Sequence, residues 1–524
     1  MSDGRSAAAR LSRPPVSLAR QSPRRRAVLA FAAGVTAALG QAPWALWPLT
    51  ILGLALVFAL SRGAAGPRQS AILWWAAGCG YFGFALSWIV EPFLVDVQVH
   101  GWMAPFALIF MAGGLALFWA LAGWLARRVV RGTGWRFAAA TALALVLAGV
   151  VRGTVFTGFP WALPGHVLIA TPALQLAQWG GAIGLSLLVI GLAVSLPLAL
   201  SRPWPGLAIW AVSLLLPGVV GVALTPPVAD TTGRPVVRLV QPNVPQDEKW
   251  DPALARAHFD RLLRLSAQAG APDLVVWPET AVPAWLEDVP HLLPVMAEAA
   301  GAAPLVFGVN RGDGPRIFNA MVLLSPGGEI AEIYDKHHLV PFGEYTPLGD
   351  LLSGIGIRGL AQREGYGFSA GPGARLIDLP GIGATLPLIC YEGIFPRDIA
   401  AAPARPELML MITNDAWFGT VSGPYQHLAQ ARLRSVEQGV PMVRVANTGI
   451  SAVIDPAGRL SGEMALGTSG VRDVALPPRS EPTLYSRLGD TPLILLLCAA
   501  LALLAPRSRA NPSDIGVDGP PGGV

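Results

Sequence analysis

The sequence predicts a chain of two parts, a polytopic α-helical membrane domain and an α/β domain. Hydrophobic residues make up 53% of the 524 residues and charged residues only 14%, well below the roughly 25% charged residues of soluble proteins. Long uncharged apolar runs fill most of residues 27–228 and return at 491–505. Between them, residues 229–486 carry more charge and alternate short apolar runs with helical patterns. These observations predict a membrane protein with a water-exposed domain before its last span.

Each predicted span is an uncharged apolar run, and a membrane helix needs about 20 such residues. The run at 27–61 is too long for one helix and contains Pro43 and Pro48, so it predicts a hairpin of two short spans. The predicted spans are 27–42, 44–61, 70–90, 101–126, 137–151, 167–201, 203–228 and 491–505. Seven spans therefore precede residue 229, and one follows residue 486.

Arginine placement predicts the orientation, because short cytoplasmic loops accumulate Lys and Arg. With the N-terminus inside, sixteen arginines fall on the cytoplasmic side, whereas the opposite loops contain only Arg152. If 27–61 were one helix, the four arginines between 127 and 136 would lie outside, so the hairpin is preferred. Residues 229–486 are then expected on the outer side, which is the periplasm in a bacterium.

The two ends of the chain are predicted to be cytoplasmic. Residues 1–26 are Arg-rich, and residues 506–524, rich in Pro, Gly and Ser, predict a disordered tail. The Arg-rich start before an apolar run also matches a signal peptide, but no small-residue cleavage site followed by polar sequence is present. These topogenic arginines largely account for the net charge of +5, so the charge gives no indication of a nucleic-acid partner.

Residues 229–486 predict a sheet that is buried on both faces. Short apolar runs that end in polar residues or glycine predict strands at 235–243, 273–280, 303–311, 319–326, 330–339, 384–393, 408–418, 441–449 and 451–460. Helical periodicity at 252–269 and 425–439 places helices between strands. The runs at 319–326 and 330–339 predict an antiparallel hairpin.

Cys390, in "LPLICYEGIFP", is the one cysteine outside the apolar spans, which contain Cys79 and Cys498. A lone cysteine is usually a small buried hydrophobe. Cys390, however, ends an apolar strand and precedes a predicted helix start. An unpaired thiol in an oxidising compartment is also prone to oxidation, which is unfavourable unless the thiol has a function. These features favour a nucleophile.

A nucleophilic thiol needs a base or a nearby cation. The chain has 36 arginines and two lysines, so a lysine is a candidate for a role that arginine cannot fill. Lys336 closes an apolar strand in "IYDKHHLVPFGEY" and is the better candidate, with solvent exposure at a strand end as the alternative. Lys249, in "QDEKWD", is expected to be an exposed surface residue.

Glu279 is the candidate base, because it follows the apolar strand of "DLVVWPET". The alternative is a simple helix cap. His337 and His338 are adjacent and would point to opposite faces of a strand, so at most one of them reaches Cys390.

The order Glu279, Lys336, Cys390 resembles the nitrilase superfamily of carbon–nitrogen hydrolases. The resemblance covers residues 235–460 and rests on "WPET", "YDKHHLVPFGEY", "LICYEGIFP" and "NDAWFG". It implies an αββα sandwich. Together with the predicted spans, "QPNVPQDEKWD" and "HLVPFGEYTP" extend the likeness over nearly the whole chain, which resembles the apolipoprotein N-acyltransferase family of the bacterial inner membrane.

This resemblance implies acyl transfer without a cofactor. A membrane phospholipid would acylate Cys390 to a thioester, and the α-amine of a diacylglyceryl-cysteine on an apolipoprotein would accept the chain. Glu279 would act as general base, and Lys336 would stabilise the oxyanion. The resemblance also implies that Glu344 orients the lysine. Tyr391 and Glu392 adjoin the nucleophile and are expected to shape the pocket, with ordinary strand-end packing as the alternative. Trp250 and Trp417 lie in loops beside the site, where they are expected either to line an acyl-chain entrance or to act as interfacial anchors. The sequence contains no metal-ligand cluster and no Gly-rich phosphate loop.

Two other functions fit parts of the sequence. A membrane-anchored amidase or nitrilase would use water as the acceptor, but eight spans exceed what an anchor requires. A transporter with an inert nitrilase-like domain would need ionisable groups within its spans, and the apolar runs contain none. The apolar loops at 281–296 and 351–369 are expected to dip into the bilayer and admit acyl chains, which favours the acyltransferase.

Overall fold

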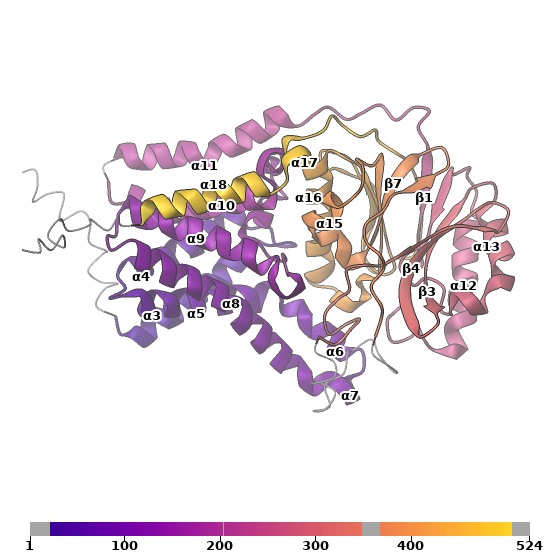
Figure 1. Ribbon diagram of the computed structural model, residues 1–524, viewed down its shortest axis with the longest axis horizontal. Coiled ribbons are helices and arrows are strands. Elements are labelled where there is room, and N and C mark those ends of the chain that lie inside the picture. The colour runs from indigo at the N-terminus through magenta and orange to yellow at the C-terminus, as the bar shows by residue number, and fades with distance from the viewer. Residues whose placement is uncertain (1–20, 203, 348–366, 506–524) are drawn as a thin grey trace, which may run out of the picture.

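The computed structural model describes residues 21–202, 204–347 and 367–505. Figure 1 shows long helices gathered at one end of the molecule and two sheets at the other, with α15, α16 and α17 between them. The predicted tail at 506–524, residues 1–20 of the predicted N-terminus at 1–26 and residues 351–366 of the predicted apolar loop at 351–369 lie outside the described residues.

The long helices of the first domain follow the predicted spans. They are α3 (Pro23–Ala38), α4 (Trp47–Arg62), α5 (Pro67–Ala85), α8 (Ala104–Val129), α9 (Trp135–Arg152), α10 (Ala177–Ala199), α11 (Trp204–Leu224) and, after the second domain, α18 (Thr491–Leu504). The run at 27–61 is divided between α3 and α4, as the hairpin requires. The predicted span at 167–201 begins within the 3-10 turn η4 (Pro164–Leu168) and continues through η5 (Pro172–Leu176) into α10.

Several of these helices have the length and apolarity needed to cross a membrane. Four meet both requirements, at Val97–Val129, Trp135–Arg152, Pro172–Ala199 and Trp204–Leu224. A fifth does so when Pro67–Ala85 and Ser87–Leu94, bent by 66°, count as one span; the latter stretch includes α6 (Glu91–Leu94). The helices α4 and α18 are apolar but shorter. The chain is a multi-pass membrane protein, and the number of eight crossings stays a prediction.

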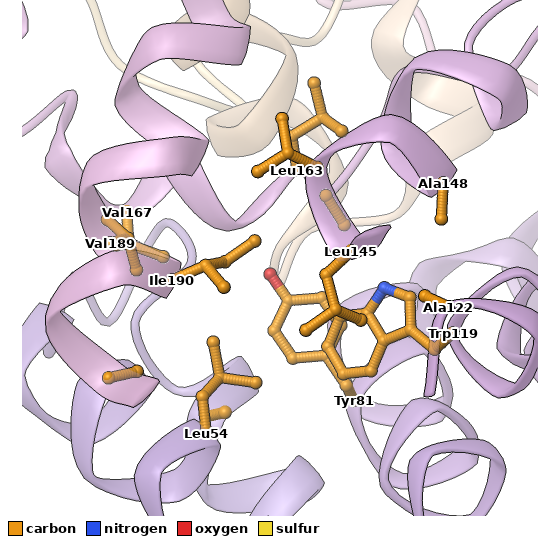
Figure 2. Packing of buried hydrophobic residues seen from close by; sticks show 14 of the residues in the cluster. Leu54, Tyr81, Trp119, Ala122, Leu145, Ala148, Leu163, Val167, Val189 and Ile190 are labelled. Atoms are coloured by element: carbon orange, nitrogen blue, oxygen red, sulfur yellow. The ribbon is translucent and has the colours of Figure 1, made fainter. Parts of the chain in front are cut away.

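Small residues let the membrane helices pack closely. A Cβ on Gly34 of α3 would lie 1.9 Å from the carbonyl oxygen of Ala77 on α5, so only glycine fits this crossing. Larger side chains fill the centre of the bundle, where the rings of Tyr81 and Trp119 lie 4.9 Å apart, near Leu145 (Figure 2). The helices are thereby joined around one apolar core.

The second domain contains two six-stranded sheets. The first has the order β12-β1-β2-β3-β4-β5, with β1 (Val236–Gln241), β2 (Leu274–Val276), β3 (Leu305–Asp313), β4 (Arg316–Leu324), β5 (Ile330–Asp335) and β12 (Gly470–Ala475). The second has the order β11-β10-β9-β8-β7-β6, with β6 (Ile377–Leu379), β7 (Gly383–Ile389), β8 (Leu408–Thr413), β9 (Met442–Ala446), β10 (Ser451–Ile454) and β11 (Leu460–Met464). In each sheet three neighbouring strands are parallel, β1-β2-β3 and β7-β8-β9.

The two sheets face each other between layers of helices. Their inner faces share one apolar core. The helices α12 (Pro252–Ser266) and α13 (Leu293–Ala300) cover the outer face of the first sheet, whereas α15 (Pro396–Ala400) and α16 (Gly423–Gln438) cover the second. The predicted αββα sandwich is confirmed. The predicted β4–β5 hairpin is also present, but the short strand β6 and the edge strands β11 and β12 were missed.

Residues 281–296 do not form the predicted membrane-dipping loop. Val282, Leu286, Val289 and Met296 are buried in the core between α13 and the first sheet. Figure 1 shows α13 at the end of the molecule farthest from the membrane helices. The apolar residues of this segment stabilise the domain, so the prediction was wrong.

Helix α16 attaches the sandwich to the membrane domain through the buried side chain of Gln426. Its Oε1 accepts hydrogen bonds from the indole nitrogens of Trp88 (3.2 Å) and Trp161 (2.7 Å). Its Nε2 donates to the carbonyl oxygens of Ala42 (3.2 Å) and Ala85 (2.9 Å). A buried amide with all these partners specifies one orientation of the two domains, because any other would leave polar groups unpaired.

Candidate active site

The three residues predicted for catalysis stand at strand ends between the two sheets. Glu279 follows β2 and Lys336 follows β5 in the first sheet, while Cys390 follows β7 in the second and begins the 3-10 turn η8 (Cys390–Ile394). All three are buried, with 6%, 1% and 6% of their surface exposed, respectively. The structure therefore brings together the side chains that the sequence singled out.

Lys336 bridges two carboxylates. Its Nζ lies 2.8 Å from Glu344 Oε1 and 3.7 Å from Glu279 Oε1. Burial by itself would lower the pKa of Lys336, but Glu344 and Glu279 outweigh it and hold the pKa above its usual value. Lys336 is therefore a permanent ammonium. The backbone N–H of Val340 donates to Glu344 Oε2 at 2.8 Å, which fixes the carboxylate that orients the lysine.

Both carboxylate oxygens of Glu279 accept hydrogen bonds from fixed donors. Asn319 Nδ2, on β4, donates to Oε1 at 2.7 Å and also reaches Glu344 Oε1 at 3.2 Å. The backbone N–H of Asn414, just after β8, donates to Oε2 at 2.8 Å. The base is thus held by donors from both sheets. Neither Asn319 nor Asn414 was predicted from the sequence.

The backbone of Cys390 has φ of +51°, the left-handed region that non-glycine residues rarely adopt. Such a conformation persists only when its surroundings hold it. Glu392 Oε2 accepts a hydrogen bond from the Ile389 N–H at 2.7 Å, and His427 Nε2 lies 3.3 Å from the Cys390 carbonyl oxygen. These contacts hold the nucleophile from both sides of the turn.

The thiol of Cys390 is protonated in the resting site. Burial and the Glu279 carboxylate raise its pKa above the ordinary value, and the Lys336 ammonium lowers it only in part. A preformed thiolate is therefore disfavoured. The thiol must lose its proton during attack, and Glu279 is the neighbouring base.

Glu392 stabilises the turn at Cys390 and does not line an open pocket. It is fully buried, and its Oε1 accepts hydrogen bonds from the Tyr334 hydroxyl (3.0 Å) and from the backbone N–H groups of His337 (2.8 Å) and His338 (3.3 Å). Burial acts to raise the pKa of Glu392, but His337 and the backbone donors lower it below its usual value. Glu392 thus joins the segment after Lys336 to the nucleophile.

The remaining predicted residues are Tyr391, Trp250 and Trp417. The Tyr391 hydroxyl donates to the Gly158 carbonyl at 3.2 Å, so this side chain contacts the membrane domain. Trp250 is exposed, and Trp417 is half-buried in η9 (Asp415–Phe418). Their role at an acyl-chain entrance stays a prediction.

The expectation that Lys249 is a surface residue was wrong. Only 4% of Lys249 is exposed. Its Nζ donates to Thr280 Oγ1 at 2.8 Å and to the carbonyl oxygen of Glu279 at 3.2 Å. Its polar neighbours in sequence suggested solvent exposure, whereas the rarity of lysine in this chain is the signal that could have found it.

A buried charged network of Asp415, His427 and Arg444 supports the turn at Cys390. His427 Nδ1 lies 2.9 Å from Asp415 Oδ1, and Arg444 Nη2 donates to Asp415 Oδ2 at 2.6 Å. Burial acts to raise the pKa of Asp415, but Arg444 and His427 lower it below its usual range, so the carboxylate stays ionised. Among the residues that the structure describes, no cluster of three His, Cys, Asp or Glu side chains is placed to hold a metal ion.

A buried cysteine, a fixed glutamate and a permanent ammonium on an αββα sandwich define a protein of the carbon–nitrogen hydrolase class. Residues 236–482 match the carbon–nitrogen hydrolase family, and residues 33–195 match the apolipoprotein N-acyltransferase N-terminal domain.

Relatives of known name extend over nearly the whole chain. The apolipoprotein N-acyltransferase of Rhodopseudomonas palustris is 37% identical over 93% of this chain and 96% of its own. Those of Brucella melitensis and Caulobacter vibrioides are 36% and 37% identical, each over 91% of this chain and 94% of their own. The chain belongs to the apolipoprotein N-acyltransferase family.

Solved structures match the second domain. A CN-hydrolase superfamily protein from Xanthomonas campestris is 21% identical, with a TM-score of 0.34, over 50% of this chain and 96% of its own. An amidase from Nesterenkonia sp. is 20% identical, with a TM-score of 0.37, over 51% of this chain and 98% of its own.

Proposed function

We propose that this chain transfers an acyl group from a membrane phospholipid to the N-terminal α-amine of a diacylglyceryl-modified apolipoprotein. Family membership supports this activity. The observation that carries it is the buried Cys390, set beside Glu279 and Lys336 in a domain that α16 attaches to membrane helices. A nucleophile able to attack ester carbonyls is thus attached to the membrane helices, which contact lipid.

In the first half-reaction, Cys390 becomes acylated. Glu279 takes the thiol proton as the sulfur attacks the ester carbonyl. Lys336, oriented by Glu344, donates a hydrogen bond to the oxyanion that forms. Collapse of the tetrahedral intermediate breaks the ester C–O bond, and the leaving alkoxide takes the proton from Glu279. The products are a thioester on Cys390 and a lysophospholipid.

In the second half-reaction, the amine attacks the thioester. The incoming ammonium first loses one proton to solvent. A second proton passes through Glu279 to the leaving thiolate, and the third remains on the amide nitrogen. Lys336 again stabilises the oxyanion, and the free thiol of Cys390 is restored.

We place this reaction at the outer face of the bacterial inner membrane. The proposed organisation is a cytoplasmic N-terminus at 1–26, a seven-span membrane domain at 27–228, a periplasmic catalytic domain at 229–486, a closing span at 487–505 and a cytoplasmic tail at 506–524. The arginine distribution supports this orientation, because the predicted outer loops contain only Arg152.

The test separates the two half-reactions. We expect the detergent-purified enzyme with phospholipid alone to accumulate an acyl adduct on Cys390, detected by mass spectrometry, with little free fatty acid. Adding a diacylglyceryl-cysteine peptide should discharge the adduct to an N-acyl peptide. The Cys390→Ala variant should form no adduct, whereas Cys79→Ala should behave as wild type. Steady fatty-acid release that the peptide leaves unchanged would instead identify a hydrolase.

A further inference from the structure

Lys249 is the one buried residue of the polar turn at 246–250, which precedes α12. Asp247, Glu248 and Trp250 are exposed, while the Lys249 side chain points inward and only 4% of the residue is exposed. Burying an ammonium is unfavourable unless it gains polar partners and opposite charge. Its surroundings therefore indicate its role.

The partners of Lys249 are the catalytic base itself and the next residue. The ammonium donates to the carbonyl oxygen of Glu279 and to the hydroxyl of Thr280. Thr280 has φ of +44°, a left-handed conformation that its surroundings must hold. On the other side, the N–H of Gly308 on β3 donates to the Pro278 carbonyl, and a Cβ on Gly308 would lie 2.5 Å from the Thr280 nitrogen. The backbone at Glu279 is thus held between β3 and Lys249.

Lys249 adds a second positive charge to a site with two carboxylates. Glu279 and Glu344 share one ammonium, that of Lys336. These three groups alone would leave a net negative charge next to the Cys390 thiol, which would oppose the oxyanion. The ammonium of Lys249 offsets this charge.

Both lysines of the chain lie against Glu279, Lys336 at its carboxylate and Lys249 at its backbone carbonyl, although the chain has 36 arginines. An ammonium is compact and can donate to two oxygens in a confined buried position, whereas a planar guanidinium needs more room. Burial lowers the pKa of Lys249 to about 8, and Glu279 and Cys390 partly offset this effect. The ammonium therefore lies within the electrostatic reach of the reacting groups.

We propose that Lys249 is a positioning residue for the base: it holds the Glu279–Thr280 backbone and supplies a second positive charge beside the reacting groups. This inference rests on the proposed role of Glu279 in activating Cys390. It does not depend on which acyl donor or acceptor the enzyme uses.

The test measures the reactivity of Cys390 without lipid substrates. Full-length enzyme in detergent is treated with iodoacetamide from pH 6 to 9.5, and mass spectrometry follows alkylation of the Cys390 peptide. Glu279 is faced by Lys336, Asn319, the Asn414 N–H and the Cys390 thiol, with Glu344 beyond them, and Lys249 itself loses its proton within this pH range. We expect Lys249→Met to slow alkylation about tenfold at pH 7 and by less above pH 8, where wild-type Lys249 is no longer charged.

Two further variants separate charge from structure. Lys249→Arg keeps the charge throughout this range, so at pH 7 it should alkylate faster than Lys249→Met even if its rate falls below that of wild type. Arg256→Met removes an exposed positive charge on α12 and should match wild type throughout. A Lys249→Met profile that superimposes on wild type would overturn the proposal. A uniform loss at every pH, shared by Lys249→Arg, would also overturn it, because it would reduce Lys249 to a structural residue. A defect in acyl transfer with normal alkylation would count against the proposed function.

Discussion

Replacing Lys249 by methionine should change how the stability of the protein depends on pH. The native site lowers the pKa of Lys249 from its ordinary value of 10.5 to about 8 through burial, so folding disfavours the ammonium. Between these two values the unfolded chain binds a proton that the native protein has released. The free energy of unfolding must therefore rise with pH across this window, and Lys249 is least favourable below pH 8.

The size of the effect follows from the difference between the two pKa values. At about 1.4 kcal/mol for each pH unit, the buried ammonium destabilises the native state by about 3 kcal/mol at pH 7. By pH 9.5 only about 1 kcal/mol of this penalty remains, so wild type should gain about 2 kcal/mol relative to Lys249→Met. For a domain of this size the gain corresponds to a rise of roughly 5 °C in Tm.

The assay compares melting temperatures of wild type and Lys249→Met at the same pH, in the same detergent, from pH 7 to 9.5. Titrating groups far from the site contribute equally to both proteins and cancel in the difference. We expect the Tm of wild type, relative to that of Lys249→Met, to increase as the pH rises. A difference in Tm that stays constant over this range would refute the reasoning, because it would mean that the Lys249 ammonium is as well solvated in the native protein as in the unfolded chain.

Three further predictions follow from the site and the arginine pattern. Lys336→Arg should lose orders of magnitude in acyl-enzyme formation without unfolding the domain, because a guanidinium cannot reproduce the ammonium between two carboxylates; retention of most activity would show that positive charge alone suffices. His427→Phe should slow Cys390 acylation about tenfold or more by removing a donor to the strained turn, and an unchanged rate would exclude this support. A topology reporter after residue 230 should lie in the periplasm and one at residue 130 in the cytoplasm, and the reverse would exclude the hairpin at 27–61.

The catalytic strand ends could be predicted because their signal is local. Glu279, Lys336 and Cys390 each follow an apolar run. About ten positions of sequence are enough to predict a buried strand that ends in a polar residue. The membrane helices are similarly local, because hydropathy over one span is enough to predict them. The division of 27–61 required only two prolines and the count of arginines on either side.

Burial of the other polar groups was decided by the tertiary structure. Lys249 stands among exposed acidic residues, and its neighbours give no sign that the turn folds its ammonium against Thr280. Gln426 and His427 belong to one helix, yet one reaches the membrane domain and the other the nucleophile. The apolar segment at 281–296 is covered by its own sheet and is not free to enter lipid. Whether a side chain meets solvent, lipid or a distant partner depends on which remote segment packs over it, and a local pattern of residues does not contain that information.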